Sequence, residues 1–415
     1  MKQYGCIGKK LPHSFSREIH RRLADYTYDL IELEEAEVGG FLTRREFAAI
    51  NVTIPYKETV IPYLDEISSV AERIGAVNTV VNREGRLYGY NTDYYGLLAL
   101  IDRLGLELTG KKVLVLGTGG TAKTARAVAS DRGARRILTV SRSRREGCIT
   151  YEDAAALHTD ADVIINATPA GMYPDCEGAP LSLAPFTALS GVVDAVYNPL
   201  RTRLVLEAQA RGIPAEGGLY MLVMQAVYAV EHFLSALLER EKAEGVFASL
   251  LSAKENIVLV GMPGCGKSTV GRLLLPEGFA FYDTDEEITR RYGHTPAELI
   301  ETRGEACFRD LESRVVADLS TKGGCVIATG GGAVLRADNV RRLKQNGRLF
   351  YLDAPLSRLV ATEDRPLSDT ADKLARLYSQ RLDVYRAAAD VTVPDLATPE
   401  AEAAYILTKR RELLR

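Results

Sequence analysis

The stretch IVLVGMPGCGKSTVGRLLL, residues 257–275, joins an apolar run to a helical pattern through the glycine-rich segment GMPGCGKST at 261–269. This segment satisfies G-x-x-x-x-G-K-[ST], in which backbone N–H groups surround a β-phosphate and the lysine reaches the β- and γ-phosphates. The serine that follows can bind the accompanying magnesium ion. Because a strand and a helix flank the segment, it predicts a nucleoside triphosphate site made of Gly264, Cys265, Gly266, Lys267, Ser268 and Thr269.

Four short apolar runs, separated by helical segments, lie in this part of the chain: IVLVG (257–261), FAFYD (279–283), CVIATGGG (325–332) and RLFYLD (348–353). Strands that alternate with helices indicate an α/β fold with a parallel sheet covered on both faces. The charged stretch EREKAEG precedes them at 239–245. We therefore predict a P-loop domain over residues 255–415, preceded by a linker at 244–254.

A second glycine-rich loop lies upstream, in VLVLGTGGTAKTARAVA at 113–129. Gly117, Gly119 and Ala122 stand in the register G-x-G-x-x-A between a predicted strand and a predicted helix. The first glycine permits a tight turn, the second lets the backbone approach a pyrophosphate, and the alanine permits close packing of helix on strand. The pattern is typical of a Rossmann-type dinucleotide-binding domain, with Gly120 and Thr121 completing the loop.

The next predicted strand, RILTV, ends at Ser141 and is followed by Arg142, Ser143, Arg144 and Arg145. Enzymes that use NAD usually carry Asp or Glu at this strand end to bind the ribose hydroxyls, whereas arginine suits a 2′-phosphate. We expect Ser141, Arg142 and Arg144 to bind NADP. A solvated basic surface turn is the alternative interpretation.

The strand and helix pattern of residues 112–214 predicts that the dinucleotide-binding domain spans 96–218. Residues 1–95 read as a smaller α/β domain, with a hairpin that turns near Glu84 and Gly85. The apolar segment 219–238 approaches the ~20 residues that a membrane span requires. Gln225, Glu231 and His232 interrupt it. We therefore expect a buried helix over 219–243 that completes the first domain.

The composition is typical of a globular protein, and the net charge favours small molecules as its partners. The net charge of -3 gives no electrostatic reason to expect a nucleic acid or a membrane surface as partner. Six scattered cysteines without a CxxC pair indicate reduced thiols in the cytoplasm. The five histidines show no zinc-binding spacing.

Two polar clusters of the first domain could face the dinucleotide: NVTIPYK at 51–57 and GYNTDYYG at 89–96. Together with five further motifs they make residues 1–243 resemble shikimate dehydrogenase. The further motifs are HSFS (13–16), GAVNTV (75–80), INATPAGM (165–172), DAVYNPLRT (194–202) and GGLYMLVMQA (217–226). The resemblance implies reduction of the 3-keto group of 3-dehydroshikimate by NADPH, which yields shikimate.

The resemblance also implies roles for individual residues. Lys57 and Asp93 match the catalytic pair, in which the lysine protonates the nascent alkoxide and the aspartate orients the lysine. The residues that match the substrate contacts of the family are Ser14, Ser16, Thr53, Asn78, Asp93, Tyr197 and Gln225. The residues that match its nicotinamide contacts are Ala195 and Gly218. The sequence departs from the family pattern at Arg17, where a proline is common, and before NVT, where FLTRREFAAI is short and lacks the usual glycine.

Later motifs resemble shikimate kinase over residues 255–415: FYDTDEEI (281–288), GEACFRDLE (304–312), ATGGGAVL (328–335), EDRPL (363–367) and QRLDVYRAAAD (380–390). The resemblance places Asp283 with Ser268 at the magnesium ion and Asp285 at the acceptor hydroxyl, where it can serve as base. Arg309 and Arg381 suit the substrate carboxylate. Gly330, Gly331 and Gly332 let the backbone approach the ring. Arg365 belongs to a lid that closes over ATP and, with Lys267, stabilises the transferring phosphoryl group. That lid is short and carries Ser368 where leucine is common.

The two halves therefore indicate a bifunctional enzyme that makes shikimate and then phosphorylates the same 3-hydroxyl. Two alternatives are open. Some regulatory proteins of quinate metabolism are built from relatives of these domains, but their catalytic positions are expected to be eroded, whereas Lys57, Asp93, Lys267 and Asp285 are all present here. A quinate dehydrogenase in the first half is the other alternative, and the arginines after Ser141 argue against it.

Overall fold

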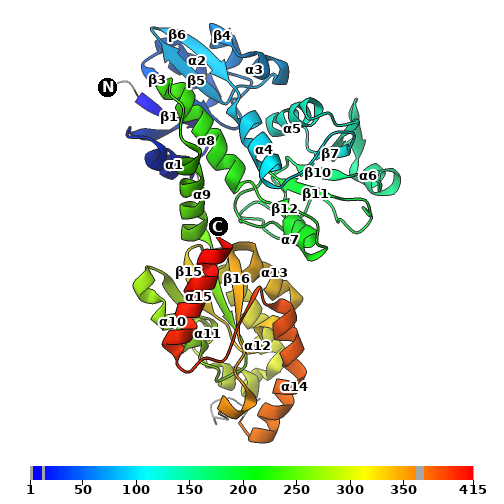
Figure 1. The fold of residues 1–415 in the computed structure, drawn as a ribbon, viewed down its shortest axis with the longest axis vertical. Coiled ribbons are helices and arrows are strands. Elements are labelled where there is room, and N and C mark those ends of the chain that lie inside the picture. Colours follow the sequence, from blue (N-terminus) through cyan, green and yellow to red (C-terminus); the bar gives the residue numbers. More distant parts are fainter. Residues whose placement is uncertain (1–2, 12–14, 361–368, 415) are drawn as a thin grey trace. The chain divides into compact units, whose positions relative to one another are not determined.

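The computed structural model describes residues 3–11, 15–360 and 369–414. The chain divides into two compact units, Met1–Phe247 and Ala248–Arg415 (Figure 1). Within the described ranges, no helix is long and apolar enough to cross a membrane.

The first unit begins with a mixed six-stranded sheet in the order β2-β1-β3-β5-β6-β4. Its strands are β1 (Gln3–Gly8), β2 (Tyr28–Glu32), β3 (Phe47–Val52), β4 (Glu66–Ile67), β5 (Thr79–Arg83) and β6 (Arg86–Tyr90). The predicted hairpin is confirmed: β5 and β6 pair antiparallel, and Glu84 and Gly85 turn with φ of 53° and 86°. The helices that accompany this sheet are α1 (Ser16–Leu23), α2 (Glu35–Arg44), η1 (Ile61–Tyr63) and α3 (Ser69–Ile74).

A second, parallel sheet of the same unit runs in the order β12-β11-β10-β7-β8-β9, which confirms the Rossmann-type expectation. Its strands are β7 (Lys112–Leu116), β8 (Arg136–Ser141), β9 (Cys148–Thr150), β10 (Val163–Asn166), β11 (Gly191–Asp194) and β12 (Ala215–Glu216). Its helices are α5 (Gly120–Asp131), α6 (Tyr151–Leu157) and α7 (Arg203–Ala210). The central strands β7 and β10 are buried along their whole length, as expected of a sheet covered on both faces.

Helices α4 (Thr92–Arg103) and α8 (Leu219–Leu234) pack against each other. Gly96 permits this contact, because a Cβ there would lie 2.6 Å from the Met221 carbonyl oxygen. The predicted single helix over 219–243 was wrong in extent. The helix α8 ends at Leu234, where Ser235 adopts a left-handed conformation with φ of 52°, and α9 (Arg240–Lys254) begins a few residues later. All of the residues predicted as a linker, 244–254, therefore lie within α9.

The second unit contains a five-stranded sheet in the order β14-β15-β13-β16-β17, and every pair is parallel, as predicted. Its strands are β13 (Asn256–Val260), β14 (Ala280–Asp283), β15 (Cys325–Ala328), β16 (Gly347–Leu352) and β17 (Val391–Val393). Its helices are α10 (Lys267–Leu273), η2 (Leu275–Glu277), α11 (Thr284–Tyr292), α12 (Pro296–Ser320), η3 (Ala333–Leu335), α13 (Ala337–Asn346), η4 (Leu356–Arg358), α14 (Ala371–Ala388) and α15 (Pro399–Leu413).

Candidate active sites

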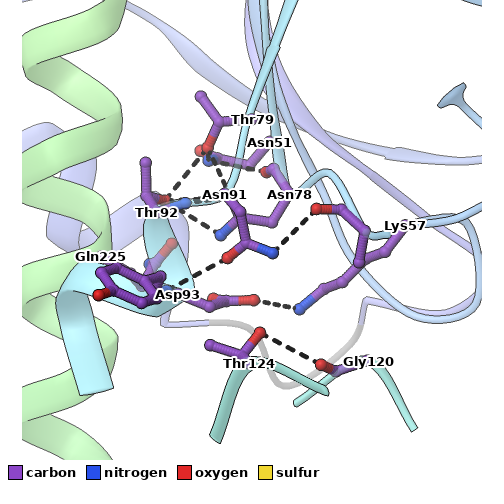
Figure 2. Close-up of polar contacts among 12 residues, drawn as sticks. Asn51, Lys57, Asn78, Thr79, Asn91, Thr92, Asp93, Gly120, Thr124 and Gln225 are labelled. Atoms are coloured by element: carbon purple, nitrogen blue, oxygen red, sulfur yellow. Dashed lines mark hydrogen bonds and ion pairs between the residues drawn. The ribbon is translucent and has the colours of Figure 1, made fainter. Parts of the chain in front are cut away.

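The structure brings the predicted catalytic pair of the first unit together. Lys57 follows β3, and its carbonyl accepts a hydrogen bond of 2.8 Å from the Val77 N–H. Asp93 lies in the first turn of α4, whose start is capped by the Asn91 side chain. Lys57 Nζ lies 2.5 Å from Asp93 Oδ2, and the two side chains are only 16% and 12% exposed (Figure 2). Such a shielded pair fixes the ammonium group in one orientation.

Asn78, a predicted substrate contact, lies beside this pair in a polar cluster (Figure 2). Its Oδ1 accepts a 2.7 Å hydrogen bond from the Thr92 backbone N–H, and its Nδ2 donates at 3.0 Å to Thr92 Oγ1. Thr79 and Asn51 continue the cluster behind Asn78. Sequence reasoning assigned no role to Asn51, Thr79 or Thr92, although all three belong to the motifs that carry the resemblance.

The predicted dinucleotide loop lies next to the catalytic pair. Gly117 turns with φ of 107°, and α5 begins at Gly120 after Gly119. A Cβ on Gly120 would lie 3.7 Å from Lys57 Cδ, so loop and lysine are neighbours. A cleft of about 930 Å³ runs past both. It is lined by Ile54, Pro55, Lys57, Glu58, Gly117, Thr118, Gly119, Gly120, Thr121, Val140, Ser141, Arg142, Ser143, Arg145, Tyr151, Ala167, Thr168, Pro169, Ala170, Asp175, Ala179 and Pro180.

This cleft is large enough for a dinucleotide, and the free backbone N–H groups at the start of α5 suit a pyrophosphate. The basic turn after β8 contributes Arg142 and Arg145 to its lining. Arg144, predicted as a cofactor contact, instead borders a separate depression with Glu146 and Asp153. The turn therefore points two of its three arginines toward the cleft.

The loop after β11 is held by the buried carboxylate of Asp194. This carboxylate accepts hydrogen bonds from the Asn166 amide (2.9 Å), the Val196 N–H (2.9 Å) and the Thr202 hydroxyl (2.7 Å). Burial raises the pKa of Asp194 to about 6 despite these donors. The loop carries the predicted contacts Ala195 and Tyr197, and the predicted contact Gly218, which precedes α8, packs against it.

Close packing explains the glycine at 218, since any Cβ there would collide with the Ala195 carbonyl. The Tyr197 ring lies 5.3 Å from the ring of Phe15, which precedes Ser16. Burial raises the pKa of Tyr197.

The remaining predicted contacts of this unit are Thr53, Gln225 and Ser14. Thr53 donates its backbone N–H to Ile7 O at 3.0 Å. Gln225 is buried on α8 and donates to the Leu222 carbonyl at 2.8 Å. Ser14 lies outside the described residues.

The phosphate loop of the second unit has the predicted form. Gly264 and Gly266 adopt positive φ of 82° and 92°. Lys267 is buried and donates to the carbonyls of Gly261 and Met262 at 3.0 and 2.9 Å. Cys265 is buried, with its sulfur 3.7 Å from Lys267 Nζ, and Thr269 lies within α10.

The residues predicted to bind magnesium are in contact, because Ser268 Oγ donates to Asp283 Oδ2 at 2.5 Å. Hydroxyl and carboxylate oxygens are the ligands that Mg²⁺ prefers, so this pair fits the ion. The other Asp283 oxygen accepts the backbone N–H of Asp285 at 2.9 Å and thereby fixes the start of α11.

Asp285 is a carboxylate of this unit whose pKa is strongly shifted. Its Oδ1 is buried without a hydrogen-bond partner among the described residues. Burial, together with the nearby charges of Asp283 and Glu312, raises the pKa of Asp285 to about 6. Glu312 Oε1 is likewise buried without such a partner. A Cβ on Gly330 would lie 2.8 Å from Asp285 Oδ1 and 2.7 Å from Glu312 Oε1, so both oxygens face this glycine.

Two arginines surround the glycine run that follows β15. Arg309 donates to Glu312 at 2.8 Å, and a Cβ on Gly332 would overlap its guanidinium group. Arg381 donates to the Gly331 carbonyl at 3.1 Å, where the Tyr385 hydroxyl also donates. Glu312 and Tyr385 were not assigned from the sequence, although both stand in quoted motifs. Arg365 lies outside the described residues.

Comparison with known proteins identifies relatives of both units. A family model described as "Shikimate dehydrogenase substrate binding domain" matches residues 6–80, and one described as "Shikimate kinase" matches residues 263–411. A shikimate dehydrogenase (NADP(+)) of Clostridium beijerinckii is 34% identical over 265 residues, which cover 60% of this chain and 97% of the relative.

Two solved structures extend the likeness of the first unit. A chorismate mutase/shikimate 5-dehydrogenase fusion protein from Clostridium acetobutylicum gives a TM-score of 0.58 at 33% identity, over 60% of this chain and 97% of that chain. A shikimate 5-dehydrogenase from Thermus thermophilus, solved in complex with NADP(H) and shikimate, gives 0.55 at 30% identity, over 60% and 99%.

Proposed function

Since this chain belongs to the shikimate dehydrogenase family over its first 60% and carries a shikimate kinase domain at 263–411, we propose that it catalyses two consecutive reactions. The first reduces 3-dehydroshikimate to shikimate with NADPH, and the second phosphorylates the new 3-hydroxyl with MgATP. The observation that supports the proposal is the presence of two chemically different groups of side chains: Lys57 with Asp93 beside a cleft of suitable size, and Ser268 with Asp283 and Asp285 beside a phosphate loop.

Bound NADPH supplies a hydride and bound MgATP supplies a phosphoryl group. In the first unit, Lys57 protonates the substrate oxygen on which negative charge develops, and Asp93, 2.5 Å away, holds the ammonium group in place. Asn78 offers the second N–H of its amide to a substrate oxygen. Gly119 and Gly120 provide the close backbone approach for the pyrophosphate, and Arg142 and Arg145 bind the 2′-phosphate.

In the second unit, Asp285 accepts the proton of the 3-hydroxyl. Its raised pKa makes it a better proton acceptor than an ordinary carboxylate. Arg309 and Arg381 bind the substrate carboxylate, and the glycines at 330–332 leave room for the ring. Lys267 exchanges its loop carbonyls for phosphate oxygens, while Ser268 and Asp283 hold the magnesium ion.

Two further points belong to this proposal. The cysteine pattern favours a cytoplasmic enzyme. The two arginines that line the cleft favour NADP over NAD. A preference for NADP supports a shikimate dehydrogenase and argues against a quinate dehydrogenase.

The proposal is tested with two lysine variants of the full chain. Lys57→Ala should lower the rate of NADP-dependent shikimate oxidation by about 10²–10⁴-fold, the usual contribution of a positioned acid or base. It should leave ATP-dependent phosphorylation of shikimate unchanged. Lys267→Ala should show the reverse pattern. Lys9→Ala is the control, because Lys9 forms an exposed ion pair with Glu34 in the same unit as Lys57. Loss of both activities in either folded variant would contradict the assignment of one reaction to each unit.

A further inference from the structure

A buried series of hydrogen bonds leads from strand β2 to Asn78. The Tyr28 hydroxyl donates to Asn51 Oδ1 at 2.7 Å, and Asn51 Nδ2 donates to Thr79 Oγ1 at 3.1 Å. Thr79 Oγ1 in turn donates to Asn78 Oδ1 at 3.1 Å. All four residues are less than 9% exposed, so water does not compete for these bonds. Figure 2 shows the part of the series from Asn51 to Asn78 and Thr92.

The orientations of the Asn51 and Asn78 amides follow from backbone groups that can act in only one way. The backbone carbonyl of Asn78 lies 3.3 Å from Nδ2 of Asn51. A carbonyl can only accept a hydrogen bond, so the NH₂ group of Asn51 must face it. Asn51 Oδ1 therefore faces Tyr28, whose hydroxyl must donate. The Thr92 backbone N–H can only donate, so it must face Oδ1 of Asn78.

This arrangement leaves one N–H of the Asn78 side-chain amide available to a ligand. Its Oδ1 receives the Thr92 N–H and the Thr79 hydroxyl, and one N–H of its Nδ2 is used by Thr92 Oγ1. Among the described residues, the second N–H has no partner. The side chain therefore presents a hydrogen-bond donor, and no acceptor, to a ligand beside Lys57 and Asp93.

Tyr28 is well suited to hold this orientation. It is buried, and its ring stacks on the neutral ring of His20 with centroids 3.9 Å apart. Burial raises the pKa of Tyr28 well above its usual value, so the hydroxyl keeps its proton at neutral pH. The adjacent Tyr26 belongs to the same aromatic group, but its hydroxyl lies 2.7 Å from His20 Nδ1 and outside the series.

We propose that Tyr28 is a positioning residue of the dehydrogenase, which acts through Asn51 and Thr79 to fix the Asn78 amide as a donor to the substrate. This inference rests on the proposed function. Without the Tyr28 hydroxyl, Asn51 Oδ1 loses the 2.7 Å donor that holds its amide, which can then turn away from Thr79 and the backbone carbonyl of Asn78. The Asn78 amide then loses one of the donors that hold it.

The test compares Tyr28→Phe with Tyr26→Phe in the full chain, by NADP-dependent oxidation of shikimate without ATP. Tyr28→Phe should raise the KM for shikimate about tenfold, the effect of one hydrogen bond, and should change kcat and the KM for NADP by less than about threefold. Tyr26→Phe should leave all three constants near wild type. Equal effects of the two variants would overturn the inference.

A second set of variants separates positioning from stability. Thr79→Val should raise the KM for shikimate as Tyr28→Phe does, and Thr79→Ser should restore it. Tyr28→Phe combined with Thr79→Val should be no worse than either alone, because both interrupt one series, whereas Tyr26→Phe with Thr79→Val should be additive. If Tyr28→Phe does not fold, an unchanged KM in Thr79→Val overturns the inference by itself. A wild-type chain that does not oxidise shikimate at all would instead refute the proposed function, and this inference with it.

Discussion

Asp93 and Asp285 both lie in the first turn of a helix, yet their surroundings give them different tasks. Asp93 has a lysine ammonium group 2.5 Å away and serves to hold it. Asp285 has two carboxylates as neighbours and one oxygen without a partner among the described residues, so its ionised form is unfavourable. A carboxylate in that position is prepared to take up a proton. The difference arises from tertiary neighbours, not from the local sequence.

This reasoning predicts a pH dependence of the kinase reaction. Asp285 accepts a proton only while it is ionised, so the rate should fall as the pH is lowered through about 6, the raised pKa of this group. The test covers about pH 5 to 7, one unit on each side of the pKa. A kinase rate that does not change over this range would contradict the role of Asp285 as proton acceptor.

The same shift predicts a stability effect. A carboxyl whose pKa is raised by folding destabilises the folded state above that pKa and has no effect below its unfolded value. Asp285→Asn should therefore raise the free energy of unfolding of the kinase unit at neutral pH by about 2 kcal/mol while abolishing phosphorylation. The gain should vanish below the ordinary value of 3.8. Asp310→Asn, which removes an exposed partner of Arg336, is the control and should change neither.

The basic turn after β8 supports a residue-level prediction on the cofactor. Arg142 lines the dinucleotide cleft, whereas Arg144 does not. Arg142→Ala should reduce the preference for NADPH over NADH at least about tenfold, because one charged hydrogen bond contributes about 1.5–3 kcal/mol. Arg144→Ala should reduce it by less than about threefold. Ratios of the specificity constants for both cofactors measure the effect, and equal losses would show that the turn is differently arranged around the phosphate.

At the scale of elements, each glycine after β15 has a different neighbour. Gly330 faces two carboxylate oxygens, Gly331 packs on Pro263 of the phosphate loop, and Gly332 lies against the Arg309 guanidinium group. This short segment therefore connects the groups proposed to bind the nucleotide, the acceptor and the carboxylate. Its function depends on the lack of side chains and not on unusual torsion angles, since Gly332 has an ordinary φ of -109°.

Gly332→Ala tests this interpretation. The added methyl group must displace the Arg309 guanidinium from Glu312, and loss of a charged hydrogen bond should raise the kinase KM for shikimate at least about tenfold. Gly245→Ala is the matched control, because a Cβ there has no neighbour within 4 Å and alanine favours a helix. An unchanged KM in Gly332→Ala would mean that Arg309 does not bind the substrate.

The sequence predicted strands β7, β8, β13, β14, β15 and β16, both glycine-rich loops and the hairpin at Glu84, because each has a local signature. It did not predict the end of α8 at Leu234, since the apolar pattern continues past Ser235 and neither glycine nor proline marks the break. It mistook most of α9 for a linker because charged residues and Gly245 dominate its first turns. Glu312 and Arg145 were not predicted for another reason. The burial of the Glu312 oxygen and the direction of the Arg145 side chain both depend on contacts with residues distant in sequence.

At the scale of the whole molecule, every residue proposed for the dehydrogenase lies in Met1–Phe247 and every residue proposed for the kinase in Ala248–Arg415. The boundary falls inside α9, and each half of this helix is bound within its own unit. Glu244 accepts the Tyr220 hydroxyl at 2.5 Å, and Phe247 packs on the Tyr220 ring. Ser252 accepts a hydrogen bond of 3.0 Å from Arg410 of α15.

Two fragments that each retain α9, residues 1–254 and 240–415, should therefore fold separately and keep their activities. Both are long enough to bury a core. Specificity constants and thermal unfolding are to be compared with those of the intact chain. A loss well beyond tenfold in a folded fragment would show that one unit completes the site of the other.

The central claim is that one chain performs two consecutive reactions, and a single coupled measurement tests it most directly. The purified full chain is supplied with 3-dehydroshikimate, NADPH and MgATP, and NADPH oxidation and shikimate 3-phosphate are followed in the same sample. We predict one shikimate 3-phosphate formed for each NADPH consumed, with no product in Lys57→Ala and with shikimate as the only product in Lys267→Ala. Accumulation of unphosphorylated shikimate by the wild-type chain, or no consumption of NADPH, would contradict the claim.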